Sequence, residues 1–184
     1  MIYLIRHGET EANIKHIYCG STDLPLSKAG IRKLQGKTYD VGDAEFVISG
    51  MKRTEQTLKL LFGDVLYRVD ERFCEIDFGI FEMQSYYHLK DTPEYQDWIS
   101  GDNEANVCPG GESGQQMEAR VMEAFNEVAE CRHDVVVVAH GGVIAAIMTN
   151  LFPDENKTRF DWQPAPGCGY VVDLIRRSYD TLNV

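Results

Sequence analysis

Apolar and polar positions fall into blocks along this chain, and the block lengths are typical of strands and helices in turn. Short apolar runs predict strands at residues 1–6, 45–49, 65–69, 135–139 and 169–175. Helical spacing of apolar positions predicts helices at about 27–39, 53–62, 113–131 and 142–152. Because the two kinds of block alternate, we expect an α/β fold: a three-layer α/β/α sandwich with a mixed, mainly parallel sheet. The order of the strands does not follow from this pattern.

Several polar residues, glycines and prolines mark where these helices begin and end. Ser27 can cap the helix predicted at about 27–39, and Ser113 with Gln116 forms a capping-box pattern at the start of the helix predicted at about 113–131. Gly63 and Pro153 stand where two other helices should stop. Thr10 can also cap a helix directly after the first strand.

Residues 80–112 break the alternation. They are rich in Tyr, Asp, Asn, Pro and Gly, with helix-like pieces at about 86–90 and 94–99. A long irregular insertion in a compact chain is usually a binding loop or a lid. We therefore expect a single domain over residues 1–184, with a lid or specificity insertion at about 80–112. The aromatic residues in and beside it are expected mainly to pack it onto the core, and some to line a pocket: Phe81, Tyr86, Tyr87, Tyr95 and Trp98.

Charge narrows the choice of partners. The 184 residues carry a formal net charge of −11, which argues against nucleic acid and anionic membranes, because both favour basic surfaces. An anionic substrate would therefore need positive charge concentrated locally in a pocket. With 43% hydrophobic residues, the chain has enough apolar side chains for a packed core.

Cysteine usage and hydropathy indicate the compartment. The five cysteines are scattered, without a Cys-x-x-Cys pair, so we expect reduced thiols and neither a disulfide framework nor a zinc site. No histidine pair has metal-ligand spacing, and His16, His88 and His133 are expected at the surface. No apolar run reaches the ~18–20 residues of a membrane span, and no secretory signal pattern is seen. We expect a cytoplasmic protein.

Two predicted strands each end in a histidine followed at once by glycine. The first strand leads into Arg6-His7-Gly8, and the strand at 135–139 leads into His140-Gly141. Ligands of open α/β sheets bind beyond the carboxyl ends of strands. The sequence therefore predicts one site assembled from both ends of the chain.

The charged residues near these strand ends suit phosphoryl chemistry. Arginine forks such as those of Arg6 and Arg53 match phosphate oxygens and keep their charge. A neutral imidazole, such as that of His7, can attack phosphorus. A carboxyl group such as that of Glu75 can protonate the leaving oxygen and then activate water. His140, if protonated, can donate to the same phosphoryl oxygens, and no metal or cofactor is required.

The motifs around these residues resemble the histidine phosphatase superfamily, which has the phosphoglycerate-mutase-like fold. The similarity extends over nearly the whole chain, in the family's order. The matching blocks are Arg6-His7-Gly8-Glu9-Thr10 with Asn13, then Gly20-Ser21 with Asp23 and Pro25-Leu26-Ser27, Lys52-Arg53 with Gln56-Thr57, Glu75-Ile76-Asp77-Phe78-Gly79, Gly110-Gly111-Glu112-Ser113, and Ala139-His140-Gly141-Gly142. Chain length and the compact insertion are similar to the branch of α-ribazole and broad-specificity phosphatases.

The resemblance implies a role for each matching residue. His7 would be the nucleophile that becomes phosphohistidine, and Glu75 the acid and then the base. Asp77 and Glu82 are the nearby alternatives to Glu75. The phosphate pocket and its substrate contacts would come from the remaining residues: Arg6, Asn13, Gly20, Ser21, Arg53, His140 and the backbone at Gly141.

The chain departs from the family pattern at three positions. Gly50 replaces a usual proline, Met83 replaces a usual glycine, and Glu55 adds a carboxylate that could compete for Arg53 if it points inward. None of these changes removes a catalytic group. Cys19 is expected near the pocket in a passive role.

We therefore expect a metal-independent phosphomonoester hydrolase that acts through phosphohistidine on a small phosphorylated metabolite. One alternative is a cofactor-dependent phosphoglycerate mutase, although true mutases of this family are longer and carry a different block after the acid. The other is a non-catalytic phospho-ligand-binding protein, although such relatives usually lose the nucleophile or the acid. The sequence does not reveal the physiological substrate or the oligomeric state.

Overall fold

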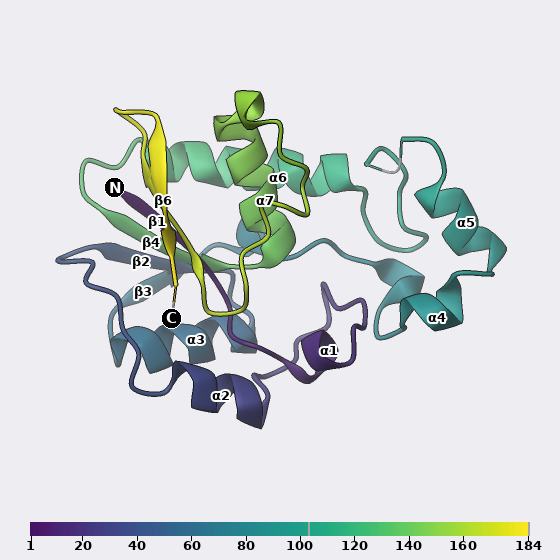
Figure 1. Cartoon of the computed structure of the whole chain (residues 1–184), viewed down its shortest axis with the longest axis horizontal. Helices are drawn as coiled ribbons and strands as arrows, with labels where there is room; N and C mark the ends of the chain where they lie inside the picture. The colour runs from purple at the N-terminus through teal and green to yellow at the C-terminus, as the bar shows by residue number, and fades with distance from the viewer. Residues whose placement is uncertain (103, 184) are drawn as a thin grey trace.

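The computed structural model describes residues 1–102 and 104–183 (Figure 1). Its strands are β1 (Ile2–Arg6), β2 (Glu45–Ile48), β3 (Tyr67–Val69), β4 (Val135–Ala139), β5 (Gly169–Asp173) and β6 (Ser178–Leu182). Its α-helices are α1 (Glu11–Ile14), α2 (Lys28–Leu34), α3 (Lys52–Phe62), α4 (Tyr86–Leu89), α5 (Pro93–Ile99), α6 (Gly114–Ala129) and α7 (Gly141–Leu151). Short 3₁₀ turns lie at Glu71–Phe73, Gly79–Phe81 and Pro153–Glu155.

The strands form one six-stranded sheet in the order β3-β2-β4-β1-β5-β6. The pairs β3·β2, β2·β4 and β4·β1 are parallel, whereas β5 is antiparallel to both β1 and β6. The sheet is therefore mixed and mainly parallel, as the alternating pattern predicted. In the register of β1 and β4, Arg6 pairs with Ala139, so the residues after both strands emerge side by side.

Helices cover both faces of the sheet. Successive residues of a strand point to opposite faces, so Leu4 packs in the core beneath α6 and α7, and Ile5 packs in the core beneath α2 and α3. Figure 1 shows α6 and α7 on one side of the strands and α2 and α3 on the other. All five residues of β4 are buried, as expected for a central strand covered on both faces. The predicted three-layer α/β/α sandwich is confirmed.

Several predicted boundaries differ from the observed ones by one to five residues. The helix expected to reach about residue 39 ends at Leu34, where Gly36 adopts φ +75°. The third strand begins at Tyr67 instead of residue 65, and the strand expected at 169–175 ends at Asp173. The sequence pattern missed β6 altogether, because this edge strand is mostly exposed and has no run of apolar residues.

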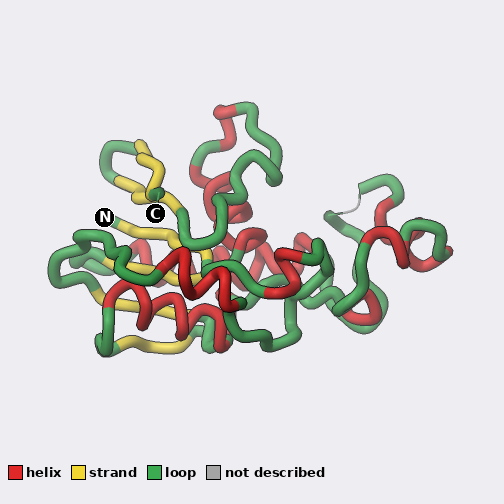
Figure 2. The backbone as a smooth tube through the Cα atoms, turned by 60° about the horizontal axis from the view of Figure 1, so that its bottom comes forward, coloured by secondary structure: helices red, strands yellow, loops and turns green. Residues whose placement is uncertain are grey.

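The insertion after β3 builds a small core of its own at one end of the molecule, away from the sheet (Figures 1 and 2). Phe81, Leu89, Tyr95 and Cys108 are buried there, and Trp98 packs against them. The packing role expected of the aromatic residues therefore holds for Phe81 and Tyr95. By contrast, Tyr86 and Tyr87 are exposed.

Over residues 1–102 and 104–183, no helix is both long enough and apolar enough to pass through a lipid bilayer.

Candidate active site

The two histidines that follow β1 and β4 lie together. The ring centroids of His7 and His140 are 5.1 Å apart, and both side chains are buried. The parallel pairing of β1 with β4 causes this proximity, since it sets the ends of the two strands side by side. The residues predicted to meet from opposite ends of the chain are thus brought to one place.

His7 is held as a neutral imidazole with one free nitrogen. Its Nδ1 lies 2.7 Å from the carbonyl oxygen of Gly8, which only accepts hydrogen bonds, so Nδ1 carries the proton. The pKa of His7 lies well below its ordinary value, first because the ring is buried and then because Arg53 and Arg6 are near. The Nε2 lone pair is therefore available for attack on an electrophile.

The loop that carries His7 is fixed by α3. The Gly8 amide donates to Thr57 Oγ1 at 2.8 Å, and the Thr57 hydroxyl donates to the Arg53 carbonyl at 2.6 Å. This chain of bonds sets the carbonyl of Gly8, which in turn orients the imidazole. The motif match included Thr57 but gave it no role.

His140 uses both ring nitrogens within the protein. Arg53 Nε donates to its Nδ1 at 3.2 Å, so the proton of the neutral ring lies on Nε2, which donates to Ser49 Oγ at 2.9 Å. Burial lowers the pKa of His140 well below its ordinary value, and Arg53 lowers it further. In this arrangement His140 holds Arg53 in place. Its donation to a phosphoryl oxygen remains a prediction that requires a different state of the ring.

Arg53 is buried, and neighbouring groups hold its guanidinium on three sides. Besides the bond to His140, it donates from Nη1 to the carbonyl of Thr22 at 2.9 Å and from Nη2 to the carbonyl of Gly20 at 2.7 Å. Each of these nitrogens has a second hydrogen, and those donors are not used by the carbonyl bonds. The predicted roles of Gly20 and Arg53 are thus structurally linked.

Arg6 leaves a donor without a partner. Its Nη1 donates to the carbonyl of Pro164 at 2.8 Å, while its Nε is buried and makes no hydrogen bond with any residue that the structure describes. Burial lowers the pKa of Arg6, and nearby Glu75 partly offsets that effect. A Cβ on Gly141 would lie 3.1 Å from Arg6 Cζ, so a larger residue there would crowd the guanidinium. A buried donor without a partner is costly unless a ligand completes it.

The site concentrates positive charge in a chain of strongly negative net charge. Among the described residues, neither Arg6 nor Arg53 forms an ion pair with a carboxylate. Both histidines are neutral, so the two guanidinium charges outweigh the one carboxylate beside them, that of Glu75. This arrangement favours an anion with several oxygens.

Glu75 lies at the start of α7. Its Oε2 accepts from the Gly142 amide at 2.9 Å, and its Oε1 accepts from its own neighbour, the Ile76 amide, at 3.0 Å. A Cβ on Gly142 would lie 2.4 Å from Glu75 Oε1, so a side chain at residue 142 would displace the carboxylate from this position. The amide of Gly142 therefore binds Glu75, and the substrate contact expected of the backbone at Gly141 stays a prediction.

The two alternative acids serve structural bonds. Glu82 accepts from the amides of Gly20, Ser21, Thr22 and Phe78 at 2.9–3.3 Å, and also from the Thr22 hydroxyl. Asp77 accepts from Ser21 Oγ and from the Gly79 amide, both at 2.9 Å. Both oxygens of Glu82 and Oδ1 of Asp77 hold loops, and neither residue lines the cavity that Glu75 shares with Arg6, which favours Glu75 as the reacting carboxyl group.

The predicted contacts Asn13, Gly20 and Ser21 have different surroundings. Asn13 lines the cavity described below, and its Oδ1 accepts from the amide and hydroxyl of Thr10, which leaves its amide nitrogen as a donor. Gly20 is confined, because a Cβ there would lie 1.6 Å from the carbonyl oxygen of Ile76. Ser21 gives its hydroxyl to Asp77, so the structure assigns it to the loop instead of the pocket.

The three departures from the family pattern leave the arginines untouched. Gly50 has φ +89°, a conformation closed to proline. Glu55 points away from Arg53 and bonds Lys59 and Tyr67 at the surface. Met83 has φ +61°, which is the left-handed region that glycine adopts without strain.

A cavity of about 450 Å³ opens beside the site. Glu75, Arg6 and Asn13 line it together with several aromatic residues: Tyr18, Phe78, Tyr95, Trp98 and Phe160. Of the aromatic residues expected near the pocket, Tyr95 and Trp98 line it, while Phe81, Tyr86 and Tyr87 do not. Cys19 also lines the cavity, but burial raises the pKa of its thiol, which disfavours the reactive thiolate.

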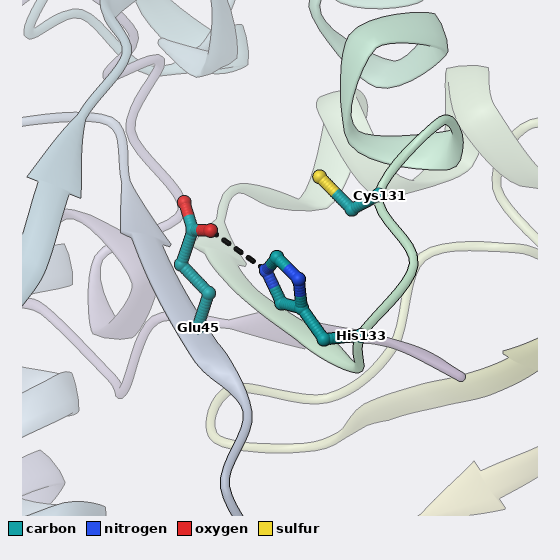
Figure 3. Close-up of side chains that lie close together, drawn as sticks. All are labelled: Glu45, Cys131 and His133. Atoms are coloured by element: carbon teal, nitrogen blue, oxygen red, sulfur yellow. Dashed lines mark hydrogen bonds and ion pairs between the residues drawn. The ribbon is translucent and has the colours of Figure 1, made fainter.

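Glu45, Cys131 and His133 form a separate cluster whose possible ligand atoms lie within 4.8 Å of one another (Figure 3). Glu45 is remote from the other two in sequence, so residue spacing gave no sign of this grouping. One Glu45 oxygen bonds His133 Nε2 at 2.8 Å and the other bonds Arg68 Nε at 2.8 Å, so a cation already accompanies the carboxylate. The cluster lies at the amino ends of β2 and β4, the edge of the sheet opposite to His7.

Comparison with known proteins agrees with this geometry. Residues 2–182 match the histidine phosphatase superfamily (branch 1). The chain belongs to this superfamily. This histidine phosphatase is 28% identical over 196 residues to the adenosylcobalamin/alpha-ribazole phosphatase of Escherichia coli (strain K12), covering 100% of this chain and 94% of that protein.

Two solved structures are similar to this histidine phosphatase over its full length. The alpha-ribazole phosphatase from Shigella flexneri has a TM-score of 0.82 and 25% identity, covering 100% of this chain and 94% of that one. The phosphoglycerate mutase from Thermus thermophilus has a TM-score of 0.75 and 28% identity, covering 100% and 98%. The phosphatase class and the phosphoglycerate-mutase-like fold predicted from the motifs are confirmed.

Proposed function

We propose that the protein is a metal-independent phosphomonoester hydrolase that forms a phosphohistidine at His7 and acts on a small phosphorylated metabolite. One observation carries the proposal: a neutral His7 with Nδ1 bonded to Gly8 leaves Nε2 free beside the buried Arg53 and the half-buried Arg6, which, among the described residues, have no ion-pair partner. Nucleophile and anion site are thus provided by the same few residues. The family membership and the relatives named as phosphatases support the assignment.

The first step transfers the phosphoryl group to the enzyme. The Nε2 lone pair of His7 forms the N–P bond while the bond between phosphorus and the ester oxygen breaks. Arg6 and Arg53 offset the charge on the phosphoryl oxygens in the transition state. Glu75, entering in its protonated form, gives its proton to the departing oxygen, so the alcohol leaves neutral.

The second step returns the enzyme to its starting state. Glu75, now a carboxylate, takes a proton from water as the water oxygen bonds to phosphorus. The N–P bond breaks, its electron pair returns to Nε2 of His7, and inorganic phosphate leaves. The amide of Gly142 keeps the carboxylate aligned in both steps.

The cavity beside the site supports a substrate with a planar organic part. Phe78, Trp98 and Tyr18 line the same cavity as Arg6, and aromatic rings can stack on planar groups. The α-ribazole group in the names of two relatives has this character. We therefore propose phosphorylated aromatic nucleoside-like compounds as the first substrates to test.

Replacement of His7 tests the mechanism. In p-nitrophenyl phosphate hydrolysis with chelator present, we expect His7→Asn to abolish turnover and to prevent acid-labile ³²P labelling of the protein. The matched control is His88→Asn, because His88 is exposed on α4 and outside the cavity. Turnover by the His7 variant, or no release of phosphate by the wild type between pH 5 and 8, would contradict the proposal.

Replacement of Glu75 separates the two steps. We expect Glu75→Gln to slow ester cleavage strongly for alkyl phosphates and least for p-nitrophenyl phosphate, whose leaving group needs no proton. Dephosphorylation should become slow for every substrate, so labelled enzyme should accumulate. Equal loss for all leaving groups, without accumulation, would remove Glu75 from this role.

A phosphoglycerate mutase is the second candidate, because a similar solved structure carries that name. Incubation with 3-phosphoglycerate and its bisphosphate distinguishes the two. Interconversion of phosphoglycerates would identify a mutase, whereas free phosphate identifies a phosphatase. Binding of phosphate without either reaction would favour the non-catalytic alternative.

A further inference from the structure

An ion pair that lines the cavity joins the insertion to the body of the protein. Arg159 lies in the segment between the last 3₁₀ turn and β5, and Glu104 lies in the insertion. Arg159 Nη1 donates to Glu104 Oε2 at 2.5 Å, and both residues line the cavity. Neither residue belongs to the sequence blocks that indicated the catalytic groups.

The pair lies next to the carboxyl group proposed as the acid. A Cβ on Gly142 would lie 2.4 Å from Glu75 Oε1 and 3.3 Å from Arg159 Nη2, so both atoms border the same small space. On the other side, a Cβ on Gly114 would lie 1.9 Å from Glu104 Oε2. Glu75 must meet the ester oxygen, so the group attached to that oxygen extends past Arg159 and Glu104.

The charges of the pair determine which groups fit there. Nη1 of Arg159 is already paired with Glu104. The carboxylate of Glu104 also presents a negative charge to the cavity. A substrate carboxylate or second phosphate would face Glu104 and would have to displace it from Arg159. An uncharged group meets neither cost, because the pair is neutral as a whole.

We propose that the Glu104–Arg159 pair is a specificity determinant that favours phosphomonoesters with an uncharged organic part and disfavours those with a second anionic group. This inference rests on the proposed function, since it takes Glu75 as the group that meets the leaving oxygen. It names two residues that separate phosphatase-type substrates from phosphoglycerates by charge alone.

The test compares two competitors of p-nitrophenyl phosphate hydrolysis that share an alkyl phosphate and differ mainly in one group. 3-Phosphoglycerate carries a carboxylate, and glycerol 3-phosphate carries a hydroxymethyl group in its place. The ratio of their inhibition constants cancels effects on the phosphate pocket itself. We expect wild-type protein to bind glycerol 3-phosphate more tightly.

Glu104→Gln should reverse the preference. The amide removes the negative charge and frees Arg159 for the substrate carboxylate, so the ratio should move about tenfold towards 3-phosphoglycerate, about the size of one charge-assisted hydrogen bond. Arg159→Gln should move it the other way, because Glu104 is then uncompensated. The double variant should return near the wild-type ratio, and Glu94→Gln, exposed on α5 outside the cavity, is the matched control.

The outcomes separate this inference from the proposed function. An unchanged ratio in both single variants, with p-nitrophenyl phosphate hydrolysis intact, would overturn the specificity role and leave the hydrolase standing. Absence of any hydrolysis by the wild type would overturn the hydrolase. If one variant fails to fold, the opposite shift expected of the other still decides the matter.

Discussion

The chemistry of each histidine in this site depends on which of its ring nitrogens is left without a hydrogen bond. Gly8 engages one nitrogen of His7 and leaves the other as a nucleophile, whereas Arg53 and Ser49 engage both nitrogens of His140. Two histidines in one pocket thus acquire different chemistry from their hydrogen bonds. A hydrogen bond that fixes the tautomer is as important here as the identity of the ring.

The pKa of His7 leads to a prediction about acid pH. Because burial and two arginines lower the pKa of His7 well below 6.5, the ring should stay neutral, and nucleophilic, as the pH falls through 6.5. In phosphate-free buffer, NMR of the imidazole carbons and protons should show neutral His7 and His140 at pH 6.5. Uptake of a proton by His7 at or above pH 6.5 would show that burial and the two arginines do not lower its pKa.

Met83 gives a prediction about stability. It adopts φ +61°, a conformation that costs a non-glycine residue about 1–2 kcal/mol, while glycine loses about 0.5–1 kcal/mol more chain entropy on folding. Met83→Gly should therefore raise the free energy of unfolding by about 0.5–1 kcal/mol in urea titration. Gln84→Gly, at a neighbour without positive φ, should lower it, and stabilisation by both would point to another cause.

At the scale of elements, the loop at residues 20–22 connects the insertion to the phosphate pocket. Glu82 binds the amides of this loop, and the carbonyls of Gly20 and Thr22 in turn bind Arg53. The loop passes so close to Ile76 that residue 20 has no space for a side chain. The position of the Arg53 guanidinium therefore depends on Glu82, because Glu82 holds the loop whose carbonyls bind Arg53.

Glu82→Gln should show this dependence. An amide offers one acceptor oxygen where the carboxylate has two, so we expect the free energy of unfolding to fall by about 2 kcal/mol. The KM for p-nitrophenyl phosphate should rise because Arg53 is less well held. Glu130→Gln, at the end of α6 and remote from this loop, is the control, and an unchanged KM would mean that Arg53 keeps its place without the loop.

At the scale of the whole molecule, one edge of the sheet gathers the chemistry. Arg6, His7, Ser49 and His140 all lie at the carboxyl ends of parallel strands, and α7 begins there beside Glu75. The opposite edge carries Glu45, Cys131 and His133. The sheet therefore separates the anion site from the cluster that resembles a metal site.

This separation predicts how the protein responds to metal removal. The charge that balances the phosphate comes from Arg6 and Arg53, so excess chelator should leave kcat and KM for p-nitrophenyl phosphate unchanged within error. Zn²⁺ bound at Glu45, Cys131 and His133 should not change the rate of hydrolysis. His133→Ala should therefore leave any effect of added Zn²⁺ on activity unchanged. Loss of activity on chelation, restored by one metal, would refute the proposed mechanism.

The layers could be predicted from residue types and spacing, whereas the site residues were predicted from the resemblance of the sequence blocks to a known family. Buried runs such as Val135–Ala139 read as strands because a strand covered on both faces is apolar throughout, and the block order placed His7, Arg53, Glu75 and His140 in a single family pattern. Local signals such as Ser113 with Gln116 were equally reliable, since a cap needs only neighbours in sequence.

Features that depend on contacts between residues far apart in sequence could be seen only in the tertiary structure. The edge strand β6 has no apolar pattern of its own and forms because β5 offers a free edge. The tautomers of both histidines, the structural use of Glu82 and the pairing of Glu104 with Arg159 follow from contacts between segments far apart in the chain. Residue types and spacing specify which groups are present, whereas packing determines which of their atoms remain free to react.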